Sequence, residues 1–302
     1  MGSKFFIGMF LAAAAAVLWG ISGTSGQYLF ESRYINVEWL STVRLLISGV
    51  ILLVYAWFMQ KSSIFFIWKN YKDISQLLIF SIFGMLAVQY TYFAAIKNST
   101  AATATVLQYS GPVMIAVYLA VRNRNMPRTR EIIAILLAVI GTFLLVTHGN
   151  IQSLVISQNA LVLGLLSAVC LAVYTLQPAK LLLKYNPLIV IGWAMFSAGI
   201  VFSFIKVPWK IEGIFDEYTY LHLGSIILLG TLIAFTFYLY SVKLIGGQKA
   251  SLLASAEPLS AAIISVYWLK TPFTVVDWIG TLCIISTVFL LSKTEKKVDL
   301  FN

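Results

Sequence analysis

The sequence predicts an all-α integral membrane protein whose ten transmembrane helices form two inverted five-helix repeats. Three observations support this fold: the composition, the length of the apolar runs and a match of the chain with itself. Of the 302 residues, 60% are hydrophobic and only 11% are charged. A soluble protein carries roughly 25% charged residues. The composition therefore excludes a soluble enzyme, and the same numbers exclude a disordered chain.

Ten apolar runs are each long enough to cross the hydrocarbon core of a bilayer, which takes about 20 residues. The runs are continuously apolar and do not alternate with polar residues. Because every backbone polar group in a bilayer must be paired internally, such runs must be helices. The expected spans are residues 5–28, 37–59, 75–96, 101–121, 131–147, 158–178, 188–206, 221–242, 249–269 and 274–292.

The basic residues concentrate on alternate loops. If the N-terminus lies inside, 15 of the 21 Lys and Arg residues lie on inner segments and 5 lie in outer loops. Short loops rich in Lys and Arg stay in the cytoplasm. We therefore expect a multi-pass protein of the cell membrane with both termini cytoplasmic. This topology also accounts for the net charge of +10 without a nucleic-acid partner.

An internal repeat relates the two halves of the chain. Residues 92–97 (YFAAIK) match residues 238–243 (YLYSVK) at an offset of 146, and Pro112 matches Pro258 in the same register. The best upstream match pairs Gly49 with Gly199. We therefore expect one five-helix repeat in residues 1–150 and a second, with a short cytoplasmic tail, in 151–302. Because five is odd, the second repeat enters the membrane inverted, as in many secondary transporters.

The motifs of both halves resemble those of a known family. They are Trp19-Gly20 in the first span, the RLLIS stretch from Arg44 in the second, the prolines of the fourth and ninth spans, and the AEPL stretch around Glu257. Together with ten spans they resemble the EamA family of the drug/metabolite transporter superfamily. The resemblance implies transport of small metabolites, often amino acids and commonly as export, through a central cavity bounded by both halves. The chain lacks the acidic residue that many relatives carry at the end of the fourth span.

Two ionisable side chains lie deep inside spans, where charge is costly and usually functional. Glu257 lies about eight residues into the ninth span and Arg44 about seven residues into the second, so we expect them at similar depth. Glu257 can couple transport to protons or pair with a substrate ammonium group, and Arg44 can bind a substrate carboxylate. The alternative is structural: Glu257 pairs with Arg44 or with backbone groups that Pro258 frees.

Other polar residues predict the lining of a central site. Pro112 and Pro258 each remove one backbone donor, and we expect them to break two helices symmetrically at the centre. Hydroxyl, amide and aromatic side chains within otherwise apolar spans must face protein or water. The alternative for each is an interhelical hydrogen bond without substrate contact. The expected substrate-binding residues are Trp19, Ser22, Tyr92, Thr105, Gln108, Tyr109, Tyr174, Tyr238 and Ser255.

These features together predict a secondary transporter that exports amino acids or related amines by alternating access. One alternative is an uptake carrier for a quaternary ammonium compound or another nutrient. A more distant alternative is a polytopic membrane enzyme acting on lipid, with Glu257 or Asp277 as its acid. We expect no cofactor and no metal, because no phosphate-binding loop or His/Cys cluster is present. The expected partners are a small metabolite, the lipid bilayer and protons.

Overall fold

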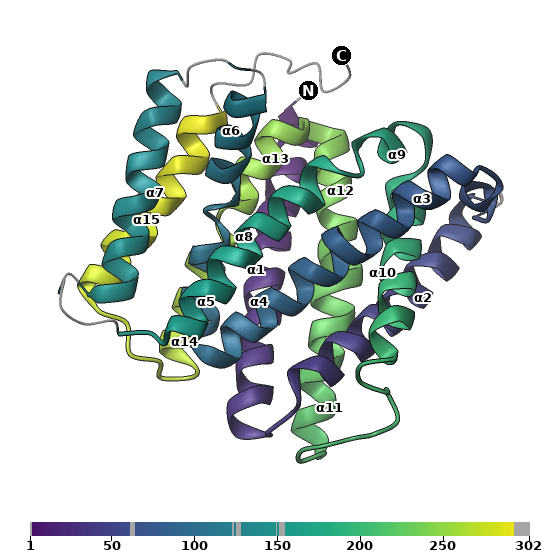
Figure 1. Cartoon of the computed structure of the whole chain (residues 1–302), viewed down its shortest axis with the longest axis horizontal. Coiled ribbons are helices and arrows are strands. Elements are labelled where there is room, and N and C mark those ends of the chain that lie inside the picture. The colour runs from purple at the N-terminus through teal and green to yellow at the C-terminus, as the bar shows by residue number, and fades with distance from the viewer. Residues whose placement is uncertain are drawn as a thin grey trace.

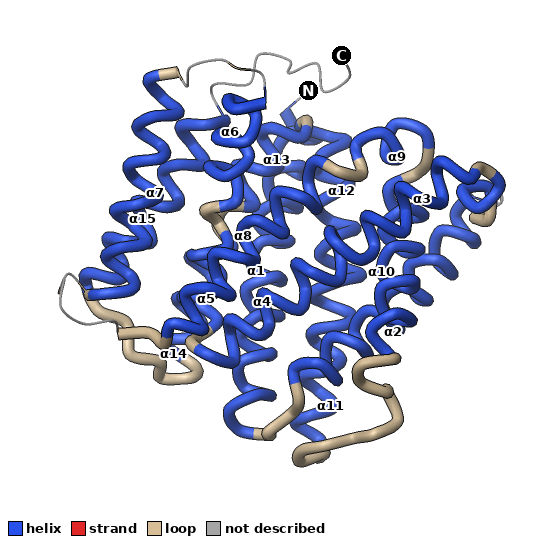
Figure 2. Tube along the Cα trace, in the orientation of Figure 1, coloured by secondary structure: helices blue, strands red, loops and turns tan. Residues whose placement is uncertain are grey.

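The structure is a computed structural model that describes residues 2–60, 64–122, 124, 128–148, 150 and 155–292 (Figures 1 and 2). In this part of the chain the regular secondary structure is helical, and no strand is present. The helices are α1 (Gly2–Ser32), α2 (Val37–Gln60), α3 (Tyr71–Ile79), α4 (Ala87–Asn98), α5 (Ala101–Gln108), α6 (Gly111–Arg122), α7 (Thr129–Thr147), α8 (Gln158–Leu176), α9 (Ala179–Lys184), α10 (Pro187–Ser203), α11 (Glu217–Gly224), α12 (Ala234–Ile245), α13 (Gly247–Ala254), α14 (Glu257–Tyr267) and α15 (Val275–Ser292). A 3₁₀ turn, η1 (Phe66–Lys69), precedes α3. Two π-helical segments, η2 (Phe80–Leu86) and η3 (Ser225–Ile233), join α3 to α4 and α11 to α12.

The ten predicted spans are confirmed, with ends that shift by a few residues. Eight helical stretches are long and apolar enough to cross a membrane: Lys4–Ser32, Val37–Phe58, Tyr71–Asn98, Ala101–Arg122, Thr129–Thr147, Gln158–Lys184, Glu217–Ile245 and Lys249–Tyr267. The two remaining predicted spans correspond to shorter apolar helices, Pro187–Ser203 and Val275–Leu291. At 1.5 Å per residue such helices reach about 26 Å, slightly less than the ~30 Å hydrocarbon core. A bilayer accommodates that difference by local thinning.

Two pairs of spans depart from a continuous α-helix at matching places. The third span contains η2 and the eighth contains η3, and the two segments overlap when the first is shifted by 146 residues. The fourth span breaks at residues 109–110 and the ninth at residues 255–256, again 146 residues apart. π-helical segments and helix breaks are frequent at functional sites. The four irregular spans therefore depart from a regular α-helix at positions that match between the two halves.

The prolines do not cause these breaks in the way the sequence suggested. Pro112 and Pro258 were expected in mid-helix, but each lies in the first turn of a new helix, α6 or α14. A first-turn residue needs no backbone donor, so proline is accommodated there without losing a hydrogen bond. The break itself falls two to three residues earlier. Consequently Thr105 and Tyr109 do not share a continuous helix face with Pro112.

Helices α1 and α8 pack in corresponding surroundings. Helix α1 contacts α12, η3 and α14, whereas α8 contacts α4, η2 and α6. Two further helices pack against their counterparts in the other half: α2 against α10 and α7 against α15. The α7–α15 pair lies at one side of the molecule, at the left of Figure 1. There Gly141 allows close approach, because a Cβ added to it would lie 2.7 Å from the backbone oxygen of Gly280.

The two ends of the helical bundle differ in charge. One edge of the molecule, called here the basic end, holds α9 and the end of α6 (Figure 1). It carries Lys180, Lys184, Arg122 and other basic residues. The opposite end holds the α1–α2 connection and the start of α11 (Figure 1). There Arg33 lies 3.0 Å from Asp216 and Lys206 lies 2.8 Å from Glu212, whereas at the basic end Lys184 lies 2.9 Å from Asp73.

Candidate functional site

The breaks of the fourth and ninth spans are joined by one tyrosine. Tyr109 follows α5, and its hydroxyl lies 2.9 Å from the Ala254 carbonyl oxygen and 3.0 Å from Oε2 of Glu257. Glu257 is the first residue of α14. The phenol therefore links a helix of the first half to a carboxylate of the second. Because a hydroxyl has one proton, these two acceptors share a single donor.

Arg44 lies in the same region but does not pair with Glu257. Its side chain is buried, with 5% of its surface exposed, and Nε donates a hydrogen bond to the Thr231 hydroxyl at 3.3 Å. The guanidinium carbon lies 5.1 Å from the ring centre of Phe93. Both charged residues are within the described part of the chain, and no ion pair of 4.0 Å or less joins them. The direct Arg44–Glu257 pair, expected as the structural alternative, is therefore not formed.

A second hydroxyl pair lies beside these charges. The Tyr92 hydroxyl and the Thr105 hydroxyl are 2.8 Å apart, and Thr105 in turn donates to the Ala101 carbonyl at 2.6 Å. Thr105 therefore has its own proton engaged, so Tyr92 donates to Thr105. Tyr92 and Glu257 are the charged or polar groups whose fields act on Arg44. We refer to Arg44, Tyr92, Thr105, Tyr109, Thr231 and Glu257 as the central polar cluster.

Aromatic rings extend from this cluster. The Trp19 ring lies 5.6 Å from that of Phe235 and 5.5 Å from that of Tyr238, measured between ring centres. Tyr174 packs in the same apolar cluster as Phe235, with its ring 5.4 Å from Phe80. These rings come from α1, α12, α8 and η2. Such rings provide flat surfaces on which a cation can rest.

The structure does not bring every predicted residue into this arrangement. Ser22 is buried against η3, where Gly230 faces it, and its hydroxyl has no hydrogen-bond partner. The Ser255 hydroxyl is used within its own helix, donating to the Leu252 carbonyl at 2.5 Å. Gln108 is buried at the end of α5.

Sequence reasoning missed two members of the site. The sequence pattern does not single out Thr231, because its span has no regular polar stripe, and Phe93 carries no polar signal. Both contact Arg44, and Thr231 lies in the π-helical segment η3. A π turn changes the residue spacing of a face, which hides a stripe that a regular helix would show.

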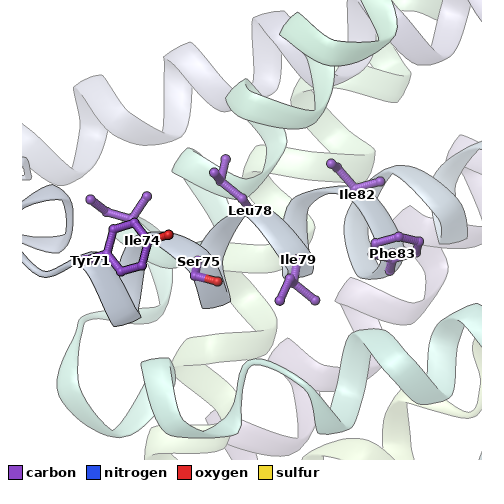
Figure 3. A pocket seen from close by; sticks show the side chains of 7 residues that line it. All are labelled: Tyr71, Ile74, Ser75, Leu78, Ile79, Ile82 and Phe83. Carbon is purple, nitrogen blue, oxygen red and sulfur yellow. The ribbon is translucent and has the colours of Figure 1, made fainter.

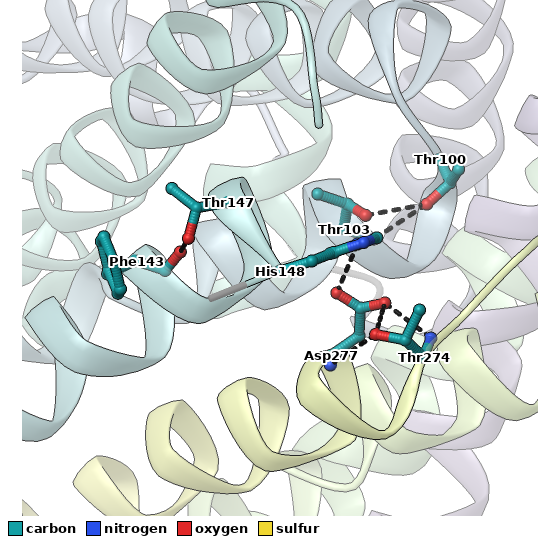
Figure 4. Close-up of polar contacts among 7 residues, drawn as sticks. All are labelled: Thr100, Thr103, Phe143, Thr147, His148, Thr274 and Asp277. Carbon is teal, nitrogen blue, oxygen red and sulfur yellow. Dashed lines mark hydrogen bonds and ion pairs between the residues drawn. The ribbon is translucent and has the colours of Figure 1, made fainter. Parts of the chain in front are cut away.

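Asp277 serves a local structural role at the opposite end of the bundle. Its carboxylate accepts hydrogen bonds from the backbone N–H and the hydroxyl of Thr274, at 2.7 and 2.9 Å (Figure 4). His148 lies 2.9 Å from the same carboxylate and ends α7 with a left-handed conformation. This contact ties the end of α7 to the start of α15. Nothing in this geometry resembles an exposed acid poised for chemistry.

A separate groove lies on the outer face of the third span. It is lined by Tyr71, Ile74, Ser75, Leu78, Ile79, Ile82 and Phe83 (Figure 3). None of these residues belongs to the central polar cluster, and most of the lining is apolar. Within the described residues, no group of three His, Cys, Asp or Glu side chains could hold a metal ion. The groove fits an acyl chain of the surrounding lipid better than a polar solute.

Comparison with known proteins agrees with the two-part organisation. Residues 6–147 and 158–293 each match the profile of the EamA-like transporter family. A similar protein is the inner membrane transporter YicL of Salmonella typhimurium, 42% identical over 290 residues that cover 96% of each chain. The transporter YetK of Bacillus subtilis is 26% identical, covering 96% of this chain and 88% of its own. One crystal structure aligns with a TM-score of 0.64 at 15% identity, covering 97% of this chain and 98% of that one, which supports the fold.

Proposed function

Because the chain belongs to the EamA-like transporter family, we propose that it is a secondary carrier that exports amino acids or related amines by alternating access. The observation that carries this proposal is the central polar cluster. It holds the buried guanidinium of Arg44 and the partly buried carboxylate of Glu257, and among the described residues no ion pair of 4.0 Å or less joins them. An amino acid carries both opposite charges, so it can satisfy Arg44 with its carboxylate and Glu257 with its ammonium group.

A buried charge without a counter-ion is unfavourable, which strengthens this argument. Among the described residues, Arg44 donates to the Thr231 hydroxyl and faces the ring of Phe93, and no carboxylate lies within 4.0 Å of it. Glu257 has the Tyr109 hydroxyl as its side-chain donor. A zwitterionic solute replaces part of the hydration that each charge loses on burial. An anion or a cation alone would satisfy only one of the two.

One observation favours a second candidate, uptake of a quaternary ammonium compound. Trp19 lies against Phe235 and Tyr238, so three aromatic rings pack together. Aromatic cages bind quaternary ammonium groups through cation–π interactions. In that case Glu257 would balance the charge of the cation and Arg44 would have only a structural role.

The two halves support a rocking mechanism. The matching π-helical segments, the matching breaks and the equivalent packing of α1 and α8 fit two repeats, residues 1–150 and 151–302, related by inversion. The two halves meet at the Tyr109–Glu257 hydrogen bond. Alternating access then requires one half to adopt the conformation of the other around this central point.

The basic end is proposed to face the cytoplasm, with both termini there. Lys180, Lys184 and Arg122 lie at this end, as the positive-inside rule requires of cytoplasmic loops. The relative named an inner membrane transporter supports placement in the cell membrane. Labelling of single cysteines in intact cells measures this orientation.

Transport is tested with the purified protein in liposomes. Radiolabelled amino acids and amines are offered as probes, and flux is measured together with product analysis. Trp19→Ala and Tyr109→Ala should weaken binding, whereas Trp209→Ala, at an exposed loop position, should not. Binding that survives both central substitutions would show that the cluster is not the site. Chemical turnover of lipid without solute flux would favour an enzyme.

Proton coupling is tested separately at Glu257. If this carboxylate carries the coupling proton, Glu257→Gln abolishes the dependence of flux on a pH gradient while exchange of substrate continues. An unchanged pH profile would remove Glu257 from the coupling step. It would then leave substrate pairing as the role of the residue.

A further inference from the structure

Helices α5 and α13 occupy matching positions in the two halves but have different surroundings. All eight residues of α5 are buried, and the helix packs against α1 and α14 at the opposite end of the bundle. In α13, Lys249 and Ser251 are exposed. In the described part of the chain, α13 makes no comparable packing contact with α8 or α6, which would be its partners if both halves were alike. The opposite end is therefore sealed and the basic end is open.

Gln27 of α1 lies at the centre of the sealed end. Its side-chain oxygen accepts a hydrogen bond from the backbone N–H of Ala101, the first residue of α5, at 2.8 Å. Its nitrogen donates to Glu31 at 2.9 Å and to the Thr271 hydroxyl, beyond α14, at 3.3 Å. The residue is buried. A single amide thus connects α1, α5 and the α14–α15 connection.

A matching glutamine lies at the basic end without the matching contact. Gln177 follows Gln27 by 150 residues, the same offset that relates Gly199 to Gly49. Its nitrogen donates to the Gln76 carbonyl at 3.0 Å, but its side-chain oxygen is buried and has no hydrogen-bond partner among the described residues. A buried acceptor without a donor is unfavourable and is rare in folded proteins.

The cap residue of α13 supplies no acceptor of its own. Helix α13 begins after Gly246, whose φ is +85° and which as a glycine has no side chain to cap the helix. At the corresponding start of α5, both Thr100 and Gln27 accept hydrogen bonds from backbone N–H groups. The first N–H groups of a helix need acceptors, and an amide oxygen supplies one. The acceptor of Gln177 and the start of α13 therefore complement each other.

We propose that Gln27 and Gln177 are alternating latches of the transport cycle. In the state described here Gln27 holds α5 closed at the opposite end, while Gln177 is released. When the carrier opens outward, Gln27 releases Ala101 and Gln177 accepts from the start of α13, which seals the basic end. This inference rests on the proposed alternating access and assigns two positioning residues to it.

The latches are tested by cysteine accessibility in the absence of substrate. Two single-cysteine reporters are made after Cys170 and Cys283 are replaced by serine: Ala101→Cys in the sealed helix α5 and Ser251→Cys in the open helix α13. Their reaction with a membrane-impermeant maleimide is measured in membrane vesicles of both orientations. Each reporter is combined with Gln27→Ala.

The proposal predicts opposite changes at the two reporters. In Gln27→Ala, labelling of residue 101 should rise about tenfold and labelling of 251 should fall, because the loss of one hydrogen-bonded latch shifts the two-state population by roughly that factor. Gln158→Ala, a substitution of an exposed glutamine at the start of α8, should change neither. Gln177→Leu should lower labelling of residue 101 below the level of the wild-type background, because it removes the unpaired acceptor that destabilises the described state.

The outcomes separate this inference from the proposed function. A rise at both reporters would indicate general loosening and would overturn the latch, as would unchanged labelling at both. Because the measurement uses no solute, opposite changes support the latch even where flux assays with amino acids fail. Conversely, amino acid flux with no response to Gln27→Ala would leave the carrier and reject the latch.

Discussion

The Tyr109–Glu257 contact gives the sharpest energetic prediction. Tyr109→Phe removes the one side-chain donor of Glu257 and leaves the ring in place. A hydrogen bond to a charged group contributes about 1.5–3 kcal/mol to stability in water-soluble proteins. Side-chain hydrogen bonds within membranes average about 0.6 kcal/mol and reach about 1.7 kcal/mol. The two ranges meet near 1.5 kcal/mol, which is the coupling energy we expect.

The coupling is measured by a double-mutant cycle. Unfolding free energies in mixed micelles are compared for wild type, Tyr109→Phe, Glu257→Met and the double variant, because the amide oxygen of a glutamine would still accept the hydrogen bond. Tyr267→Phe is the matched control, because this tyrosine ends α14 with 73% of its surface exposed and should lose almost nothing. Independent sites add within about 0.3–0.5 kcal/mol. A coupling energy inside that limit would refute the idea that this contact holds the two halves together.

Two further predictions concern packing and pH. Gly141→Ala should destabilise the protein by about 1–3 kcal/mol, because its Cβ would lie 2.7 Å from the backbone of α15. Gly224→Ala is the control, because nothing lies within 4 Å of its Cβ and it should not destabilise the protein. Equal melting temperatures of the two variants would contradict the predicted clash at Gly141. The backbone N–H of Thr219, followed by the Thr219 hydroxyl and Arg33, holds the pKa of Asp216 below its ordinary value of 3.8. The ionised carboxylate therefore stabilises the fold at pH values above 3.8, and this stabilisation is lost on acidification. The melting-temperature difference between wild type and Asp216→Asn should shrink as the pH falls below about 4. A difference that stays constant with pH would argue against this role of Asp216.

The spans could be predicted from the sequence because hydropathy acts locally. A run of about 20 apolar residues has few alternatives to a membrane helix. The charged residues Arg44 and Glu257 were also found this way, since a charge inside such a run is conspicuous. The internal sequence match also indicated regions where the spans are irregular, such as the region around Pro258.

The exact site contacts could not be predicted for the same reason. Whether Arg44 pairs with Glu257 or with Thr231 depends on the rotation of three helices, which one-dimensional patterns leave undefined. The π-helical segment η3 shifts the facing of Thr231, and the break at residues 109–110 separates Thr105 from Pro112. Each changes the direction in which the following side chains face, and so alters which side chains meet.

The amino-acid sequence by itself determined the number of spans, their approximate positions and the residue matches between the two halves, because each depends on apolar length and on residue identity at a fixed offset. Only the tertiary structure decided which of two matching contacts is made. Gln27 and Gln177 are the same residue type in corresponding positions, yet one is bonded to the start of a helix and the other is not. That difference accompanies the packing of the helices, because α5 packs against α1 and α14 whereas α13 makes no comparable contact with α8 or α6 in the described part of the chain, and such long-range packing is not written in local sequence patterns.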